Sequence, residues 1–430
     1  MPKPKNSSEV TLDSTNLRKN FVWNLIGSTA ASFLSLFLMM IVTRLNGIDD
    51  AGIFAFAFST ASLFTVIGTY SGRTFQVTDK NRKTTDSDYF YLKIVTSITM
   101  LIIGLIFCFI RGYSGDKILV IMSLVGYRVF EVLSEWGYAV IQKKDRLYQV
   151  GRSMVIKTLL SLAGFFIVDH LTHNIALSCA MVIFGHLMPM IFYDLPNLMR
   201  TQFKFGEFNP KKVQYLFKIG FFTFGFTFLN LYVVGAAKYA LDSAGDNSAQ
   251  TIYGIIAMPA TVLSLVGQYL IQPFLTNFKK FFASDANKFQ ALVAKLCLAI
   301  AVIGTVCVLA AWLMGLPVLE LLYAIELDGN TWNLVMIIMG GVFGALVLVI
   351  STALVTMRHT SDQFWIFCVV SLMTLGISHI LVSWGGIMGA CLSYLTSMIL
   401  LFGMYLVVFL YRMRELRQDP DREVRRAATE

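Results

Sequence analysis

The sequence predicts an all-α polytopic membrane protein of about twelve transmembrane helices, arranged as two parallel-repeat lobes of six helices around a central cavity. Three observations lead to this class. The 430 residues are 56% hydrophobic and only 14% charged, whereas a soluble domain would carry about 25% charged residues. The apolar residues come in runs of roughly 18 to 25, long enough to cross a hydrocarbon core about 30 Å thick. Finally, the second half of the chain resembles the first.

The apolar runs are expected to form the spans in chain order, with polar segments between them. Residues 1–20 are polar and no short apolar run with a cleavage site follows them, so they are expected to be a tail rather than a signal peptide. Proline can break the helical ladder inside three spans, at Pro189, Pro259 and Pro273. The expected spans lie at about 21–43, 51–70, 89–110, 118–141, 153–169, 175–195, 217–238, 250–275, 291–314, 332–357, 363–384 and 387–411.

The repeat appears when the chain is shifted by 199 residues, which lays Ile53–Tyr70 over Ile252–Tyr269. This match pairs the second span of each half, and because six is even, both halves enter the membrane from the same side. The expected plan is a parallel repeat with a site between the halves. The predicted organisation is an N-tail (1–20), an N-lobe (21–195), an inter-lobe loop (196–216), a C-lobe (217–411) and a basic C-tail (412–430).

Lys and Arg residues are distributed unevenly between the two sides. With the N-terminus inside, the inner segments hold 27 of the 35 Lys and Arg residues, the outer loops hold four, and the remaining four lie within spans. The positive-inside rule therefore predicts that both termini are cytoplasmic. The net charge of +9 is explained by this topology and by contact with anionic lipid head groups, so no nucleic-acid partner is predicted.

No motif in the sequence points to an enzyme, a cofactor or a metal site. A phosphate-binding loop of the GxxxxGK[ST] type is missing, which argues against ATP hydrolysis by this chain. All six cysteines fall inside apolar runs, with neither disulfide nor metal spacing. No Ser/His/Asp set is legible, and the longest predicted outer segment, around 315–331, is too short to form a catalytic domain.

The fourth span carries the strongest candidate site. Arg128, Glu131 and Glu135 are spaced i, i+3, i+7, so a helix places them on one face. Charges at membrane depth usually face a bundle interior or a water-filled cavity. They form either a structural network in which Arg128 pairs with Glu131, or a cavity wall in which Arg128 meets an anionic head group and a glutamate takes up protons or cations. Lys157, in the next span, is a further candidate.

Five stretches together resemble the bacterial polysaccharide flippases of the multidrug/oligosaccharidyl-lipid/polysaccharide exporter (MOP) superfamily. The turn from span 1 into span 2, the segment after span 2 and the loop between spans 4 and 5 are similar to family segments, and two further stretches fit the ends of spans 7 and 9. These stretches are Thr43–Phe64, Gly72–Ile94, Ile141–Lys157, Ala236–Asp242 and Gly315–Gly329.

The resemblance implies a two-lobed transporter in a bacterial plasma membrane that moves a polyprenyl-linked oligosaccharide to the outer leaflet by alternating access. Membrane lipids, and the polymerase and glycosyltransferases of the same pathway, are its implied partners. Arg44, Arg73 and Lys238 match recurrently basic family positions. Lipid II flippases of the superfamily have two extra helices that form a lipid groove, and these have no counterpart among the twelve spans. Groups suited to lining a sugar site include Asn24, Tyr127, Tyr138, Gln142, Asn230, Tyr232 and Gln268.

Three other functions remain open from the sequence. A cation-coupled multidrug exporter would share the fold, but its cationic substrates suit an acidic cavity better than one holding Arg128 and Lys157. A membrane polysaccharide polymerase or ligase would share the hydropathy, but such enzymes commonly carry a large, arginine-bearing outer loop. A scaffold for a glycan-assembly complex is the third alternative.

Overall fold

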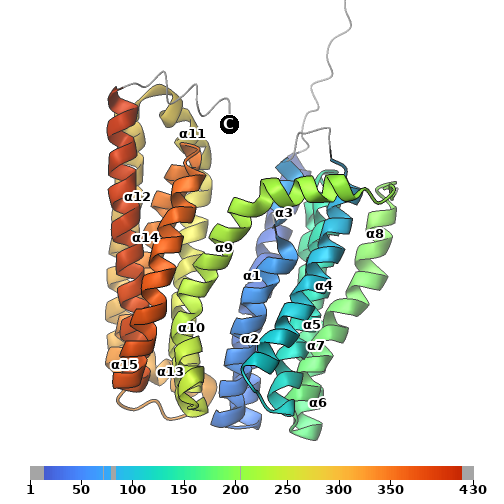
Figure 1. Cartoon of the computed structure of the whole chain (residues 1–430), viewed down its shortest axis with the longest axis vertical. Coiled ribbons are helices and arrows are strands. Elements are labelled where there is room, and N and C mark those ends of the chain that lie inside the picture. Colours follow the sequence, from blue (N-terminus) through green and yellow to red (C-terminus); the bar gives the residue numbers. More distant parts are fainter. Residues whose placement is uncertain (1–13, 71, 79–83, 204, 419–430) are drawn as a thin grey trace, which may run out of the picture.

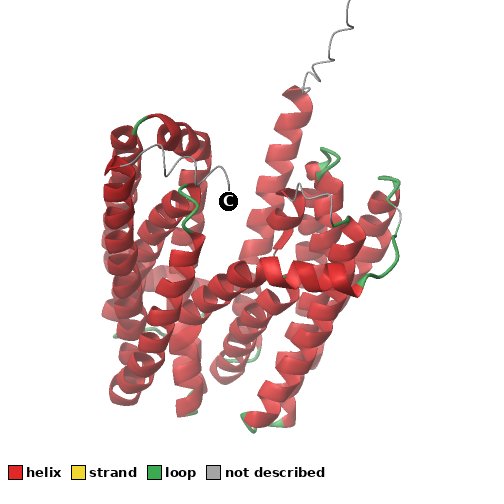
Figure 2. Cartoon of the chain, turned by 45° about the horizontal axis from the view of Figure 1, so that its top comes forward, coloured by secondary structure: helices red, strands yellow, loops and turns green. Residues whose placement is uncertain are grey.

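The computed structural model describes residues 14–70, 72–78, 84–203 and 205–418. Within these ranges the chain is helical, with short turns between helices (Figure 2). The N-lobe comprises α1 (Ser14–Leu45), α2 (Ile48–Thr69), α3 (Gly72–Thr78), α4 (Asp86–Ile110), α5 (Gly115–Gln142), α6 (Leu147–Thr172), α7 (Ile175–Pro189), the π-helix η1 (Met190–Asp194) and α8 (Leu195–Met199).

The C-lobe follows in the second half of the chain, and Figure 1 shows it beside the N-lobe. It comprises α9 (Pro210–Ala244), α10 (Asn247–Ile271), the 3-10 helix η2 (Gln272–Phe274), α11 (Leu275–Ser284), α12 (Ala286–Ala310), the π-helix η3 (Ala311–Gly315), α13 (Leu316–Tyr323), α14 (Thr331–Thr356) and α15 (Thr360–Gln418).

The helices account for twelve spans. In the described part of the chain, ten helical segments are long and apolar enough to cross a membrane. To these we add α5, which is long enough but carries at least three charged residues in every 18-residue stretch. Helix α15 supplies two spans, because it reverses at Gly386, whose φ of 53° and ψ of −122° interrupt the helix. The predicted all-α membrane fold is confirmed.

The two lobes repeat the same helix pairing. In the N-lobe, α1 packs against α6 and α2 against α5. At the equivalent places in the C-lobe, α9 packs against α15 and α10 against α14. Between the lobes α2 packs against α10, the two helices that align in the sequence, and a Cβ on Gly52 would collide with the backbone of Asn247. The chain is therefore built as a parallel repeat.

Helix boundaries extend beyond the predicted spans. The side chain of Asn209 caps the first turn of α9, and Pro210 at its first position is already set for a helix, so α9 begins inside the segment expected to be a loop. Likewise, α1 begins at Ser14 and α15 continues to Gln418. The rest of the predicted tails, residues 1–13 and 419–430, lies outside the described residues.

Helix α9 links the lobes at the end of the molecule where α1 begins. Figure 1 shows its N-terminal half leaning across the N-lobe. There the hydroxyl of Tyr70 donates a hydrogen bond to the Phe217 carbonyl (2.9 Å), and Lys212 pairs with Asp88 (3.4 Å).

The opposite end, where the lobes meet directly, is here called the closed end. Arg44 donates hydrogen bonds to the carbonyls of Leu321 (2.7 Å) and Leu322 (3.0 Å), and Ser248 donates one to Asp49 (3.1 Å). The helices of the two lobes converge toward these contacts (Figure 1).

Candidate functional site

A central cavity of about 490 Å³ lies between the lobes, among α1, α2, α9, α10, α14 and α15. Among its described lining residues Lys238 is the one charged side chain, and its ammonium donates a hydrogen bond to Ser59 Oγ (2.7 Å). The other polar groups are hydroxyls and an amide, from Ser35, Ser59, Ser62, Asn230, Tyr239, Tyr253, Thr261, Ser264 and Tyr394. The rest of the lining is apolar, so the cavity places one cation and neutral hydrogen-bonding groups in a largely apolar wall.

A second, smaller pocket of about 70 Å³ lies within the N-lobe. It brings together the predicted charged face of α5 and the lysine of α6, because Arg128, Glu131, Glu135 and Lys157 all line it. Arg128 Nη1 pairs with Glu131 Oε2 at 2.5 Å, and its guanidinium lies 4.7 Å from the ring centroid of Tyr127.

Lys157 is held by a partner that the sequence did not reveal. Its ammonium contacts Asp194 Oδ2 (2.5 Å), Ser134 Oγ (2.5 Å) and the Tyr138 hydroxyl (2.8 Å). The side chains of Lys157 and Asp194 are only 5% and 9% exposed. Asp194 is the last residue of the π-helix that follows Pro189. The wider turn of a π-helix changes the side of the helix on which the Asp194 side chain lies.

Arg128 connects the small pocket with the central cavity. Its Nη2 donates a hydrogen bond to Ser62 Oγ (2.9 Å), and Ser62 lines the central cavity. Phe58 lines both spaces and lies 5.0 Å from the guanidinium. A change at Arg128 therefore reaches the wall of the larger cavity.

The remaining predicted site residues lie in different places. Lys238 is in the central cavity, and Arg73, on α3, lies close enough to Glu135 to interact electrostatically. Arg44 instead binds backbone carbonyls at the closed end. Asn24 lies where α1 meets α6, and its Oδ1 is buried without a hydrogen-bond partner in the described structure.

Of the groups proposed to line a sugar site, Asn230 lines the central cavity, while Tyr127 and Tyr138 line the small pocket. Most hydroxyl groups of the cavity were not predicted. Two of them, Ser59 and Ser62 on α2, are spaced i, i+3 and therefore lie on one face of the helix. That spacing was the available signal for them.

The central cavity and the small pocket differ in the size of the ligand that they can hold. Sites for small organic ligands measure about 300–1,000 Å³, so the central cavity can hold part of a glycan and the small pocket cannot. Buried atoms of the small pocket, Arg128 Nε and Glu135 Oε2, have no hydrogen-bond partner among the described residues. They leave capacity for a small polar species or a proton.

A third cavity, of about 470 Å³, is lined almost entirely by apolar side chains of α1, α10, α12, η3, α13 and α14. Met258 lines both this cavity and the central one, so the two spaces adjoin. Next to it, Pro259 on α10 and Cys307 on α12 form part of the apolar wall. A cavity that holds a cation and hydroxyl groups thus adjoins an apolar one, and this arrangement fits an amphipathic ligand.

We expect Arg128→Ala to slow transport by roughly tenfold or more, because the variant loses the charged hydrogen bond to Ser62. Folding should persist, since Glu131 is 35% exposed and can be hydrated when its partner is gone. Transport by equal amounts of reconstituted protein measures the effect. If Arg128→Ala and Glu131→Ala each only lower protein abundance and the double variant restores it, the pair is structural.

Comparison with known proteins gives similarity along nearly the whole chain. No protein-family profile matches it. Over 384 residues, 88% of this chain and 96% of the relative, it is 22% identical to the capsular polysaccharide biosynthesis protein CapF of Staphylococcus aureus.

Solved structures of similar fold are MOP-superfamily transporters. One is a multidrug resistance MATE family transporter in an inward-facing conformation (TM-score 0.67, 12% identity, covering 92% of this chain and 99% of that one). Another is a multidrug resistance MATE family transporter in an outward-facing conformation (TM-score 0.61, 12% identity, covering 96% of this chain and 100% of that one). A third is a MOP-superfamily transporter from Pyrococcus furiosus (TM-score 0.58, 13% identity, covering 96% of this chain and 100% of that one). With twelve spans in two repeated lobes, the chain thus has the fold of these transporters, and along nearly its full length it is similar to a polysaccharide-biosynthesis protein.

Proposed function

We propose that this transporter moves a polyprenyl-pyrophosphate-linked oligosaccharide from the inner to the outer leaflet by alternating access. The observation that carries the proposal is the central cavity, in which Lys238 is the one charged group of the described lining and stands among hydroxyls and an amide. A pyrophosphate needs a cation, and a sugar needs neutral donors and acceptors. The name of the relative CapF, a capsular polysaccharide biosynthesis protein, agrees with such a substrate.

Orientation follows from the distribution of basic residues. In our proposal the closed end, with Arg44 and Asp49, faces outside, and the opposite end, where α1 begins, faces the cytoplasm. The described conformation is then inward-facing, ready to take a head group from the inner leaflet. Glycosyltransferases that build the substrate and a polymerase that consumes it would be its functional partners.

The hydrocarbon tail of the substrate would lie in the apolar cavity. This cavity adjoins the central one at Met258, so a head group near Lys238 and a tail among α10, α12 and α14 can be bound together. Such a site would accommodate the tail within the twelve described spans.

Filling the apolar cavity should weaken transport of the lipid-linked substrate. Cys307→Trp places a large ring in this cavity, and we expect a transport loss of roughly threefold to tenfold from the displaced tail contacts. Leu298→Trp, on the exposed face of the same helix, is the matched control and should transport normally. The rate in proteoliposomes is compared at equal protein content. Equal rates for both variants would rule out the tail site.

The substrate class is tested by reconstitution. Protein in liposomes that carry a fluorescent polyprenyl-pyrophosphate oligosaccharide should move the label between leaflets, while protein-free liposomes should not. The alternative, a multidrug exporter, rests on the fold shared with MATE transporters. A lining whose one charge is positive suits cationic drugs poorly. Uptake of cationic dyes against a proton or sodium gradient, without glycan movement, would favour that alternative.

A further inference from the structure

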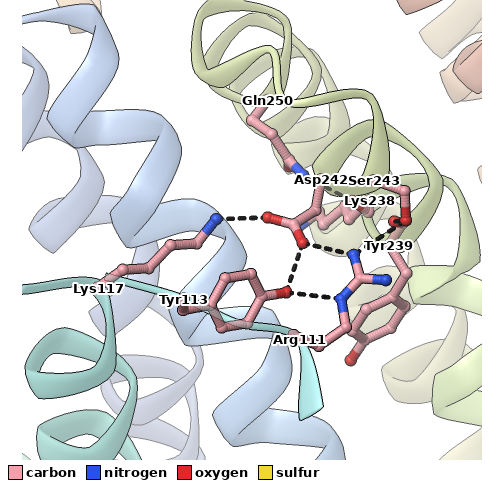
Figure 3. A network of polar contacts seen from close by, with 8 residues as sticks. All are labelled: Arg111, Tyr113, Lys117, Lys238, Tyr239, Asp242, Ser243 and Gln250. Carbon is pink, nitrogen blue, oxygen red and sulfur yellow. Dashed lines mark hydrogen bonds and ion pairs between the residues drawn. The ribbon is translucent and has the colours of Figure 1, made fainter. Parts of the chain in front are cut away.

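At the closed end a single carboxylate binds three donors from the other lobe (Figure 3). The side chain of Asp242, near the end of α9, is only 2% exposed. It accepts hydrogen bonds from Lys117 Nζ (2.5 Å), the Tyr113 hydroxyl (2.5 Å) and Arg111 Nη2 (2.9 Å). Arg111 also donates one to Ser243 Oγ (2.9 Å). We call these five residues the Asp242 network.

The network divides unequally between the lobes. Both of its cations, Arg111 and Lys117, belong to the N-lobe, and its one anion, Asp242, belongs to the C-lobe. When the lobes separate at this end, the cations stay on one side and the carboxylate leaves with the other. The N-lobe then keeps two cations and the Tyr113 hydroxyl, arranged around the place of an anion.

The network lies next to the central cavity. Lys238 precedes Asp242 by four residues on α9, one helical turn, and lines the cavity. A chain of aromatic rings makes a second link: Tyr239 lines the cavity and packs edge-on against Phe56, which packs edge-on against Tyr113, both at 5.8 Å between centroids. An anion held at Lys238 is therefore within one turn of the Asp242 carboxylate.

We propose that Asp242 occupies a phosphate site and is exchanged for the phosphate groups of the substrate. In this closed state the carboxylate stands in for the ligand on Arg111, Tyr113 and Lys117. A pyrophosphate arriving at Lys238 repels Asp242 and takes over its N-lobe partners, which releases the lobes at the closed end. This inference rests on the proposed function, because it requires the anionic head group of the proposed substrate to separate the lobes at the closed end.

The exchange explains how opening can depend on substrate. Without an incoming anion, separation breaks the three hydrogen bonds from the N-lobe to Asp242 and nothing replaces them. Hydrogen bonds between charged groups are the stronger ones, so their loss opposes opening. The pyrophosphate of the substrate bears one negative charge on each phosphate and so more in total than a carboxylate, and its oxygens can accept several hydrogen bonds from arginine, lysine and tyrosine at once. A substrate that binds the open state better shifts the population toward it.

Two variants of the same network should change substrate affinity in opposite directions. Asp242→Asn removes the internal competitor and keeps the site, so we expect undecaprenyl pyrophosphate to bind roughly tenfold more tightly. Lys117→Met removes a ligand-binding cation, so binding should weaken by roughly tenfold. Equilibrium binding to purified full-length protein in phosphatidylcholine nanodiscs measures both. If the Asp242 network only holds the lobes together and binds no ligand, both variants should change the affinity in the same direction. That result would overturn the proposal.

A protein whose Asp242 network is unaltered provides a second test. Spin labels on exposed positions of the two lobes, introduced by Ser114→Cys and Ala244→Cys after the native cysteines are replaced, report the separation at the closed end. Undecaprenyl pyrophosphate, and inorganic pyrophosphate at higher concentration, should increase the long-distance population. An equal response to phosphatidylglycerol alone would overturn the proposal, since bulk lipid would then fill the site.

Failure of this inference can be told apart from failure of the proposed function. If the protein translocates a lipid-linked oligosaccharide but undecaprenyl pyrophosphate leaves the label distance unchanged, the exchange at Asp242 is wrong and the function stands. If it neither binds undecaprenyl pyrophosphate nor translocates the glycan, the proposed function fails as well.

Discussion

Lys238→Met is expected to slow translocation of a pyrophosphate-linked glycan by roughly tenfold to a hundredfold, the value of one charged hydrogen bond of about 1.5–3 kcal/mol. Lys238 is the one charged group in the described lining of the central cavity, and methionine keeps much of its length without its charge. The partner lost on the protein side is the neutral hydroxyl of Ser59, so no opposite charge is left unpaired. Transport by proteoliposomes with equal protein content measures the loss.

Two controls separate a role in transport from a role in folding. Lys238→Arg keeps a cation in the cavity and should retain more activity than the methionine variant. Lys279→Met makes the same chemical change at an exposed position of α11 and should transport like wild type. If Lys238→Met transports normally, or if its loss is explained by lower abundance in the membrane, the cavity cation does not bind substrate.

Lys157→Met should cause the largest loss of stability. It leaves the Asp194 carboxylate, only 9% exposed, without its cation, and removal of one partner from a buried pair costs about 3–5 kcal/mol. The hydroxyls of Ser134 and Tyr138 lose the same partner. We expect the purified variant to denature in detergent at a clearly lower temperature than wild type, as followed by size-exclusion chromatography after heating.

The double variant Lys157→Met/Asp194→Leu tests the physical reason for that loss. Replacing both members of a buried ion pair by apolar residues of similar size is often neutral or stabilising, so most of the stability should return. If the double variant regains stability and transport, the pair is structural. If it regains stability alone, Lys157 and Asp194 take part in transport. A Lys157→Met protein as stable as wild type would contradict the pairing itself.

The fold could be predicted closely because membrane spans are encoded locally. A run of apolar residues long enough to cross the bilayer must form a helix that satisfies its own backbone, whatever its neighbours. The same reasoning placed Arg128, Glu131 and Glu135 on one face of α5, and these side chains do line one pocket. The ends of the helices could be predicted less closely than the spans. At α9, for example, the first residue is set by the cap at Asn209 and by Pro210, which involve only one turn of helix.

Partners distant in sequence could not be predicted in this way. Asp194 meets Lys157 only because a π-helix follows Pro189, and local apolar patterning does not signal that insertion. Asp242 lies 131 residues from Arg111, and the pair forms only when the lobes meet. Arg44 has the charge expected of a substrate ligand but binds backbone carbonyls of α13, a contact between lobes that a single sequence does not encode visibly.

The most direct test of the central claim is the rate at which purified protein moves a fluorescent polyprenyl-pyrophosphate oligosaccharide across a proteoliposome membrane. The protein is compared with protein-free liposomes and with Lys238→Met. We predict rapid movement by the wild-type protein, a strongly reduced rate for the variant, and only background movement without protein. Wild-type protein that leaves the glycan in its original leaflet, while it accumulates cationic dyes against an ion gradient, would contradict the account.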